Sequence, residues 1–126
     1  MPGSHSTMPF TVLENRHAVK FDFVTAWEVF EHIPAYRLPG FFANIRNHLA
    51  PNGVFIGSVC TISAGLSEDG TEHHVTIKPW EWWAKQFTKH GFEEDATLRD
   101  YFDPDWVRGP NTGVAGSICS AWCPVA

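Results

Sequence analysis

Two carboxylates and an imidazole follow closely on an apolar run in the first part of the chain. The run, FDFVTAW, occupies residues 21–27, and Glu28, Glu31 and His32 come directly after it. Carboxylate oxygens and an imidazole nitrogen can together hold a divalent cation, with water and substrate oxygens in the remaining coordination positions. The spacing therefore predicts a candidate cation-binding or catalytic site where this run ends.

Two predicted strands and a helix frame these residues. Residues 21–27 and 54–60 are rich in aromatic and β-branched side chains without alternation, which favours strands buried on both faces of a parallel sheet. Apolar residues recur at helical spacing in residues 38–49, which predicts an amphipathic helix. The sequence APNG at 50–53 predicts the end of that helix and a turn.

A second helix and two further strands are predicted downstream. Residues 78–92 have Pro79 near the first turn and Gly91 just past the end, which is typical of helix boundaries. The remaining segments are assigned as two loops at 61–74 and 103–116, two strands within 93–102 and at 117–125, and a short strand or coil at 9–20.

Strands that alternate with helices imply an α/β domain with three layers, α/β/α, and a partly parallel sheet. No helix is predicted between the last two strands, so we expect them to form an antiparallel hairpin. In doubly wound sheets, ligands bind outside the carboxyl ends of the strands. Glu28, Glu31 and His32 therefore lie where a ligand is expected.

The composition narrows the class of function. The 126 residues suffice for one domain, expected at 9–126, after a disordered or cloning-derived start at 1–8. The net charge is -5 and no long Lys/Arg run occurs, so nucleic acid and anionic membranes are not favoured as partners. The apolar runs are too short to span a bilayer. Three cysteines without a Cys-x-x-Cys pair indicate reduced thiols in a cytoplasmic protein.

Residues 21–126 resemble the C-terminal half of a class I S-adenosylmethionine-dependent methyltransferase. The resemblance rests on FDFVTAWEVFEHI, a helix, LAPNGVFIGSV, HHVTIKPWEWWAKQFTKHGF and a closing hairpin, in that order. It implies a partial Rossmann-like methyltransferase sheet that ends in an antiparallel hairpin. It also implies that S-adenosylmethionine is the cofactor and that Ala26, Trp27 and Glu28 border it.

A subset of this family is similar in its Glu-x-x-Glu-His motif, including small-RNA 2′-O-methyltransferases and quinone-biosynthesis O-methyltransferases. These enzymes carry a later histidine, which is His74 here by its place before VTIKPWEWW, with His73 as the neighbouring candidate. The resemblance implies that Glu28, Glu31, His32 and His74 hold Mg²⁺ beside an acceptor hydroxyl. The metal would polarise the hydroxyl, whose oxygen attacks the donor methyl group.

One part of the family pattern does not occur. The family opens with a glycine-rich turn that approaches the methionine part of the donor, but Gly3 is the only glycine before Phe21. The main half of the donor site is therefore expected to be absent. The chain could be a fragment, a truncated gene product or a chain that another subunit completes.

Three functions stay open at this point. The first is a methyltransferase or half-enzyme that acts on a hydroxyl. The second is a non-catalytic remnant that binds or dimerises, because strand 21–27 would expose an apolar edge to a second copy unless residues 9–20 cover it. In that case Glu28, Glu31 and His32 only pin the loop. The third is a metal-dependent hydrolase built from the same residues and His74.

Overall fold

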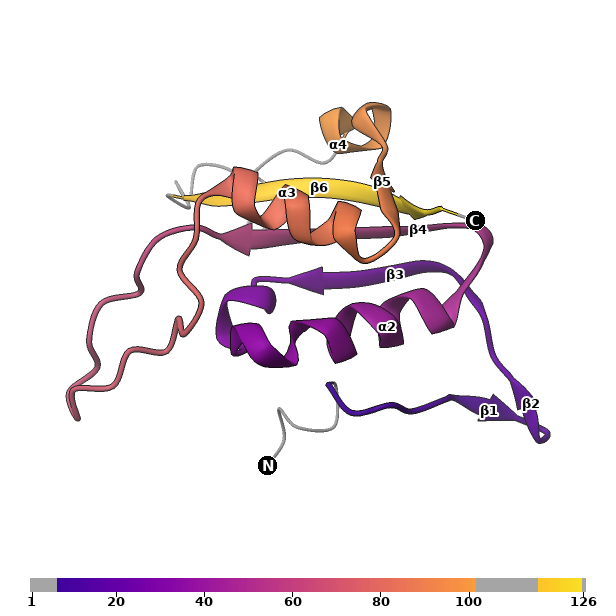
Figure 1. The fold of residues 1–126 in the computed structure, drawn as a ribbon, viewed down its shortest axis with the longest axis horizontal. Coiled ribbons are helices and arrows are strands. Elements are labelled where there is room, and N and C mark those ends of the chain that lie inside the picture. The colour runs from indigo at the N-terminus through magenta and orange to yellow at the C-terminus, as the bar shows by residue number, and fades with distance from the viewer. Residues whose placement is uncertain (1–6, 102–115, 126) are drawn as a thin grey trace.

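The computed structural model describes residues 7–101 and 116–125. Its main sheet has the strand order β3-β4-β6-β5 (Figure 1). These strands are β3 (Phe21–Trp27), β4 (Leu49–Cys60), β5 (Phe92–Glu94) and β6 (Ser117–Pro124). β3 runs parallel to β4, whereas β6 is antiparallel to both β4 and β5. The α/β fold class and the closing antiparallel pair are therefore as the sequence predicts.

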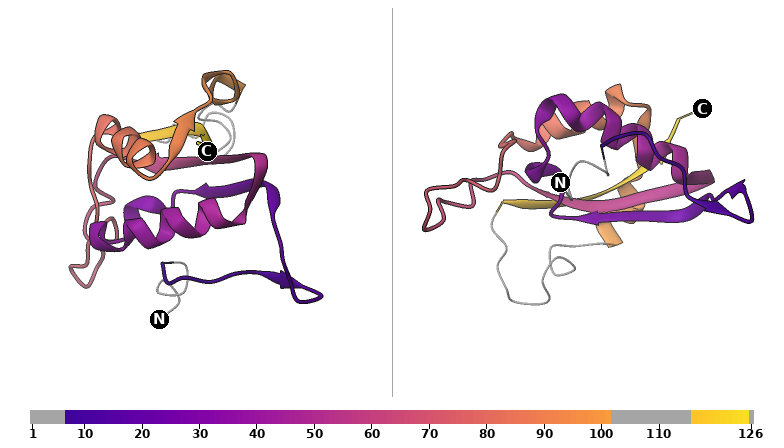
Figure 2. Two further views of the ribbon diagram at one scale, coloured as in Figure 1. Left: turned by 45° about the vertical axis from the view of Figure 1, so that its right-hand side comes forward. Right: turned by 90° about the horizontal axis from the view of Figure 1, so that it is seen from below.

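Helices α2 (Leu38–His48) and α3 (Trp80–Lys89) lie side by side on one face of the sheet (Figure 2). Both were predicted, and α3 begins after Pro79 and ends before Gly91, as the boundary residues indicate. Gly91 has φ +89°, a conformation that glycine adopts without strain. The single-turn helices η1 (Phe30–His32) and η2 (Ala35–Arg37) connect β3 to α2.

A short helix, α4 (Ala96–Tyr101), lies between β5 and β6, on the other face of the sheet from α2 and α3 (Figure 2). The prediction of no helix between the last two strands was therefore wrong. Asp95 explains the difference, because its Oδ1 accepts the Leu98 N–H at 3.0 Å and its carbonyl accepts the Arg99 N–H at 3.0 Å. An aspartate that satisfies the free amides of the first turn is a favourable helix start.

Strand β3 was predicted to be buried on both faces, and this was wrong. Phe21 is 41% exposed and Phe23 is 63% exposed. Within the described part of the chain, β3 is an edge strand with β4 as its single neighbour. The backbone edge of β3 that faces away from β4 is unpaired there, and the Phe21 and Phe23 side chains are only partly covered by other elements. An apolar strand needs a second neighbour and two helical layers before all of its side chains are buried.

The predicted turn at 50–53 is accommodated inside β4. Phe21 pairs with Leu49 and Phe23 pairs with Val54, so the β4 side of the ladder contains extra residues there. Asn52 has φ +65°, as turn residues often do. The turn residues therefore form a bulge in a continuous strand, and residues 54–60 continue as the predicted central strand.

An aromatic core lies between the helices and the sheet. The rings of Phe87 on α3 and Trp122 on β6 stack with centroids 4.4 Å apart and an interplanar angle of 3°. Phe30 of η1 is fully buried and contacts Phe41 at 5.0 Å and Trp83 at 5.9 Å between ring centroids. This anchoring of Phe30 fixes the backbone of Glu31, the next residue.

The N-terminal segment forms a hairpin of two-residue strands, β1 (Leu13–Glu14) and β2 (His17–Ala18). The residues before it run back along α2 (Figure 1). The predicted loop at 103–116 falls outside the described residues except for Gly116. None of the helices in the described ranges has the length and apolarity that crossing a membrane requires.

Candidate functional site

A sharp change of backbone direction at the carboxyl end of β3 positions the acidic residues. Glu28 has φ +57°, a backbone conformation that residues other than glycine adopt only at a cost in free energy. Its N–H donates to the carbonyl oxygen and to Oγ of Ser58, both at 3.1 Å. These bonds tie the strand exit to β4 and direct the chain into η1.

The Glu28 carboxylate is held by two serine hydroxyls. Oγ of Ser58 donates to its Oε2 at 3.1 Å, and Oγ of Ser117 donates to its Oε1. The carboxylate thereby joins the ends of β3, β4 and β6. Glu28, the acidic residue expected to be shared between donor and metal, is thus engaged by the sheet and is not among the residues whose ligand atoms cluster.

Glu31 presents a buried carboxylate without a hydrogen-bond partner. Its side chain is 0% exposed, and neither carboxylate oxygen accepts a hydrogen bond of normal geometry from the described residues. Burial raises the pKa of the Glu31 carboxyl, the Glu28 carboxylate adds to the rise, and nearby backbone amides offset only part of it. A buried, unpartnered carboxylate is costly, which points to a missing cation or proton.

Two histidine rings face this carboxylate. Nδ1 of His32 lies 2.8 Å from the His73 carbonyl oxygen, and Nδ1 of His74 lies 2.8 Å from the Ile62 carbonyl oxygen. Carbonyl oxygens only accept, so each Nδ1 carries a proton, and Nε2 is the ring nitrogen whose lone pair a neutral imidazole would offer to a cation. The rings meet edge to face with centroids 4.8 Å apart. This second-sphere arrangement is common for metal-binding histidines.

Glu31, His32 and His74 each place one ligand atom within 4.8 Å of the others. The structure therefore brings together three of the four predicted ligands and leaves Glu28 out. His73 has an exposed side chain and contributes its carbonyl group to His32. The donor set and the unpartnered Glu31 oxygens fit a divalent cation.

The loop that carries His74 is ordered by Glu72. Oε1 of Glu72 accepts the N–H of Ala64 at 3.2 Å and the N–H of His74 at 3.0 Å, while Oε2 accepts the Ser63 hydroxyl. The Ser63 hydrogen bond contributes most to lowering the pKa of Glu72. The backbone N–H groups of Val75 and Thr76 then donate to the Glu31 carbonyl, at 2.8 Å and 3.1 Å. The loop is thereby fixed against η1.

Sequence reasoning missed the residues that support this site. Ser58 and Ser117 hold Glu28, and the buried Thr76 donates its hydroxyl to the Ile33 carbonyl at 2.6 Å. Serines inside apolar strands and a threonine in a loop carry no recognisable motif. The available signal was that Ser58 and Ser117 are polar residues in predicted strands, and that the strand with Ser58 was predicted to be buried.

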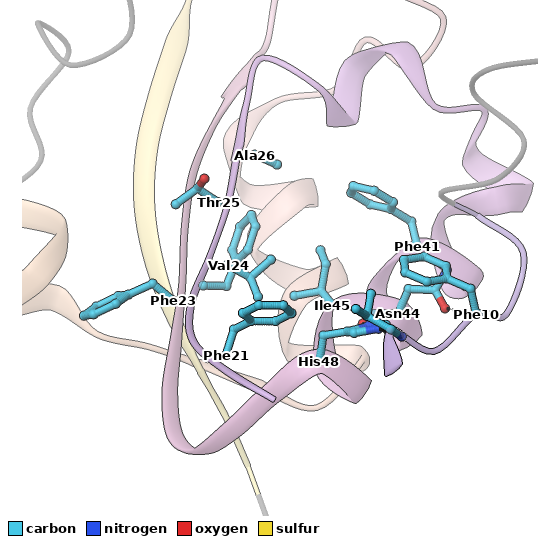
Figure 3. Close-up of a pocket in the computed structure, with 12 residues that line it drawn as sticks. Phe10, Phe21, Phe23, Val24, Thr25, Ala26, Phe41, Asn44, Ile45 and His48 are labelled. Carbon is cyan, nitrogen blue, oxygen red and sulfur yellow. Dashed lines mark hydrogen bonds between the residues drawn. The ribbon is translucent and has the colours of Figure 1, made fainter. Parts of the chain in front are cut away.

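A separate apolar pocket of about 390 Å³ lies between β3, α2 and the N-terminal segment (Figure 3). Ala26 lines it, whereas Trp27 and Glu28 lie half-buried at the strand exit. Its lining is formed by Phe10, Val12, Phe21, Phe23, Val24, Thr25, Ala26, Phe41, Asn44, Ile45, His48 and Phe55.

Comparisons with known proteins agree with this architecture. The profile of a family described as "Methyltransferase domain" matches residues 4–104. Among curated proteins, no sequence match was found. The solved structure of a DhpI–SAH complex superposes with a TM-score of 0.55 and 21% identity, over 84% of this chain and 48% of that chain.

The glycopeptide N-methyltransferase MtfA superposes with a TM-score of 0.58 and 12% identity, over 94% of this chain and 58% of that chain. The chain thus spans about half the length of the solved structures it matches. At these identities, the superpositions establish a shared Rossmann-like fold. Together with the profile match over most of its length, they show that the chain belongs to the methyltransferase domain family.

Proposed function

We propose that this chain is the acceptor-side portion of an S-adenosylmethionine-dependent methyltransferase that transfers a methyl group to a hydroxyl. Family membership and the fold support the methyltransferase part of this proposal. The DhpI structure, by its title a complex with SAH, supports the donor. MtfA is titled an N-methyltransferase, so the choice of a hydroxyl rests on the cluster of Glu31, His32 and His74.

The observation that carries the proposal is the buried Glu31 carboxylate, which lacks a hydrogen-bond partner and faces the two histidines. Glu31, His32 and His74 would hold a divalent cation, which supplies a positive charge that polarises an acceptor hydroxyl. Glu28 acts as a positioning residue, because its bonds to Ser58 and Ser117 fix the strand exit on which η1 and Glu31 depend.

The donor set bears on which cation binds. The resemblance implies Mg²⁺, which prefers six oxygen ligands in near-ideal octahedral geometry. Two imidazole nitrogens and one carboxylate suit Mn²⁺ or Zn²⁺ better, and affinity for such nitrogen-containing sites rises along the first-row metals. We therefore expect Mn²⁺ and Zn²⁺ to bind more tightly than Mg²⁺.

Thermal unfolding of the chelator-treated chain, with and without added Mn²⁺, tests the cation site. A cation that binds only the folded state stabilises it by mass action and so raises the melting temperature. At a free Mn²⁺ concentration a hundred times the dissociation constant, the free energy of unfolding increases by about 2.7 kcal/mol. We expect a rise in the unmutated chain and its loss in His74→Ala. His73→Ala is the matched control and should keep the rise, since it retains the carbonyl that contacts His32.

A melting temperature that Mn²⁺ and Zn²⁺ leave unchanged would rule out the cation site. A rise that persists in His74→Ala but disappears in His73→Ala would place the cation elsewhere.

The second candidate is a non-catalytic module that binds or dimerises. The open edge of β3 favours it, because Phe23 is 63% exposed beside unpaired backbone groups in the described structure. Edge-to-edge pairing of β3 with a second copy is the corresponding homodimer. Cys60, Cys119 and Cys123 form no disulfide with one another, which fits the proposed cytoplasmic location. We also propose a single domain at 9–126.

A further inference from the structure

Three polar side chains of α2 bind the backbone of an extended N-terminal segment, residues 7–12, here named the arm. Asn44 donates its Nδ2 to the Met8 carbonyl at 2.8 Å and accepts the Phe10 N–H at Oδ1 at 3.4 Å. Nδ2 of Asn47 donates to the Phe10 carbonyl at 3.3 Å. Nε2 of His48 accepts the Val12 N–H at 3.0 Å. Helix α2 thus recognises an extended peptide backbone.

The arm also forms one wall of the apolar pocket. The Phe10 ring lies 4.7 Å from the His48 ring, measured between centroids, on the α2 side of the pocket (Figure 3). Phe10 and Val12 line the pocket opposite β3. Even so, Phe10 is 44% exposed and Val12 is 41% exposed, so the arm buries less apolar surface than a core segment and detaches at a lower cost.

The hinge that holds the arm in place is strained. The arm connects to β3 through the β1–β2 hairpin, in which Asn15 has φ +50° and Arg16 has φ +67°. Left-handed backbone is unfavourable for arginine, and tight hairpins normally place glycine there. The hairpin is closed by the two residue pairs of β1 and β2 and by the Val19 N–H, which donates to the Val12 carbonyl at 2.8 Å. Opening the hinge would therefore relieve strain while losing few backbone hydrogen bonds.

We propose that the arm exchanges between two copies of this chain, so that residues 7–12 of one copy bind the α2 surface of the other. The complementarity is already present, because the arm and its binding surface fit each other within one chain. Exchange keeps these contacts and removes the strained turn, which favours a domain-swapped dimer. Phe10 and Val12 of the second copy would then complete the pocket. This inference does not depend on methyltransferase activity.

Light scattering after size exclusion tests the proposal on the full chain. A short linker gives an effective local concentration on the order of 1 mM, so the protein is examined at up to about 0.5 mM. We expect a concentration-dependent species of twice the 14.2 kDa chain mass. Arg16→Gly relieves the strain in the closed hinge and should reduce the dimer fraction several-fold. A strictly monomeric chain across this range would overturn the proposal.

Isotope-filtered NMR distinguishes arm exchange from edge pairing. In a dimer made from ¹³C-labelled and unlabelled chains, we expect nuclear Overhauser contacts between Phe10 of one chain and His48 of the other. A dimer in which these contacts stay within one chain contradicts exchange.

The variant Thr25→Pro separates the two kinds of dimer, because it blocks pairing at the β3 edge and leaves the arm unchanged. Glu28 donates its N–H to Ser58 on β4, and N–H directions alternate along a strand, so the Thr25 N–H points to the open edge. Proline there should block edge pairing and leave the exchanged dimer intact. Loss of the dimer in a folded Thr25→Pro chain would favour edge pairing and overturn exchange.

Discussion

Glu31 should govern both the pH dependence of stability and the response to metal. Its pKa is raised above 4.5 by burial, so the folded state keeps this proton to a higher pH than the unfolded chain does. The folded state then binds more protons, and the unfolding free energy falls as pH rises from about 4.5 to the raised folded pKa. Without metal, ionisation of this carboxylate therefore destabilises the fold, and the loss of stability is complete above the raised pKa.

Glu31→Gln keeps the shape of this side chain and removes its charge. In chelator at pH 8, we expect the variant to be more stable than the unmutated chain, because burying an unpaired charge costs more than burying a neutral amide. The advantage should shrink as pH falls toward 4.5, and added Mn²⁺ should stabilise the unmutated chain alone. Denaturant titrations at several pH values measure these differences, and a variant less stable than the unmutated chain at pH 8 in chelator would contradict the account.

The site could be predicted at the residue level only in part. The Glu-x-x-Glu-His spacing and the position of His74 identified the three residues that meet. The sequence did not reveal that Glu28 adopts a left-handed conformation and binds Ser58 and Ser117. At Glu28, the positive φ depends on tertiary contacts, because glutamate is not a residue type that favours this conformation locally.

At the level of elements, the predicted strands and helices formed near their expected positions, because their apolar patterns match what the aromatic core requires. The differences have local causes. Asp95 starts α4, and the bulge around Asn52 absorbs a turn within β4. The exposure of β3 depends instead on which neighbours it has, and a strand's own composition does not specify those.

Gly57 is the residue on which the β3–β4 contact should depend most. A methyl group there would clash with the Ala26 backbone carbonyl and lie 2.8 Å from Cζ of Phe55. We expect Gly57→Ala to destabilise the fold by about 2–3 kcal/mol, through displacement of β3.

Gly65→Ala is the matched control for this substitution. Gly65 has φ +79° with open space around it, so alanine there should cost about 1–2 kcal/mol from backbone strain alone. Urea midpoints compare the two, and a smaller loss for Gly57→Ala than for Gly65→Ala would contradict close packing of β3 on β4.

At the scale of the whole molecule, the chain corresponds to about half of the methyltransferases that it superposes on. Two surfaces of the described structure are consistent with a chain that corresponds to half of a methyltransferase. The carboxyl end of β3 leads to the cluster of Glu31, His32 and His74, and the lateral edge of β3 that faces away from β4 has no paired strand within the described residues. The first is the site proposed for a cation and an acceptor, whereas the second leaves backbone groups that another strand could pair with.

Calorimetric titration of S-adenosylhomocysteine into the purified full chain, with and without Mn²⁺, tests the central claim most directly. The account predicts saturable binding, because Ala26, Trp27 and Glu28, which are proposed to border the donor, are held in place by β4 and β6. Absence of binding by a folded sample in both conditions would contradict a methyltransferase role for this chain and favour the non-catalytic module.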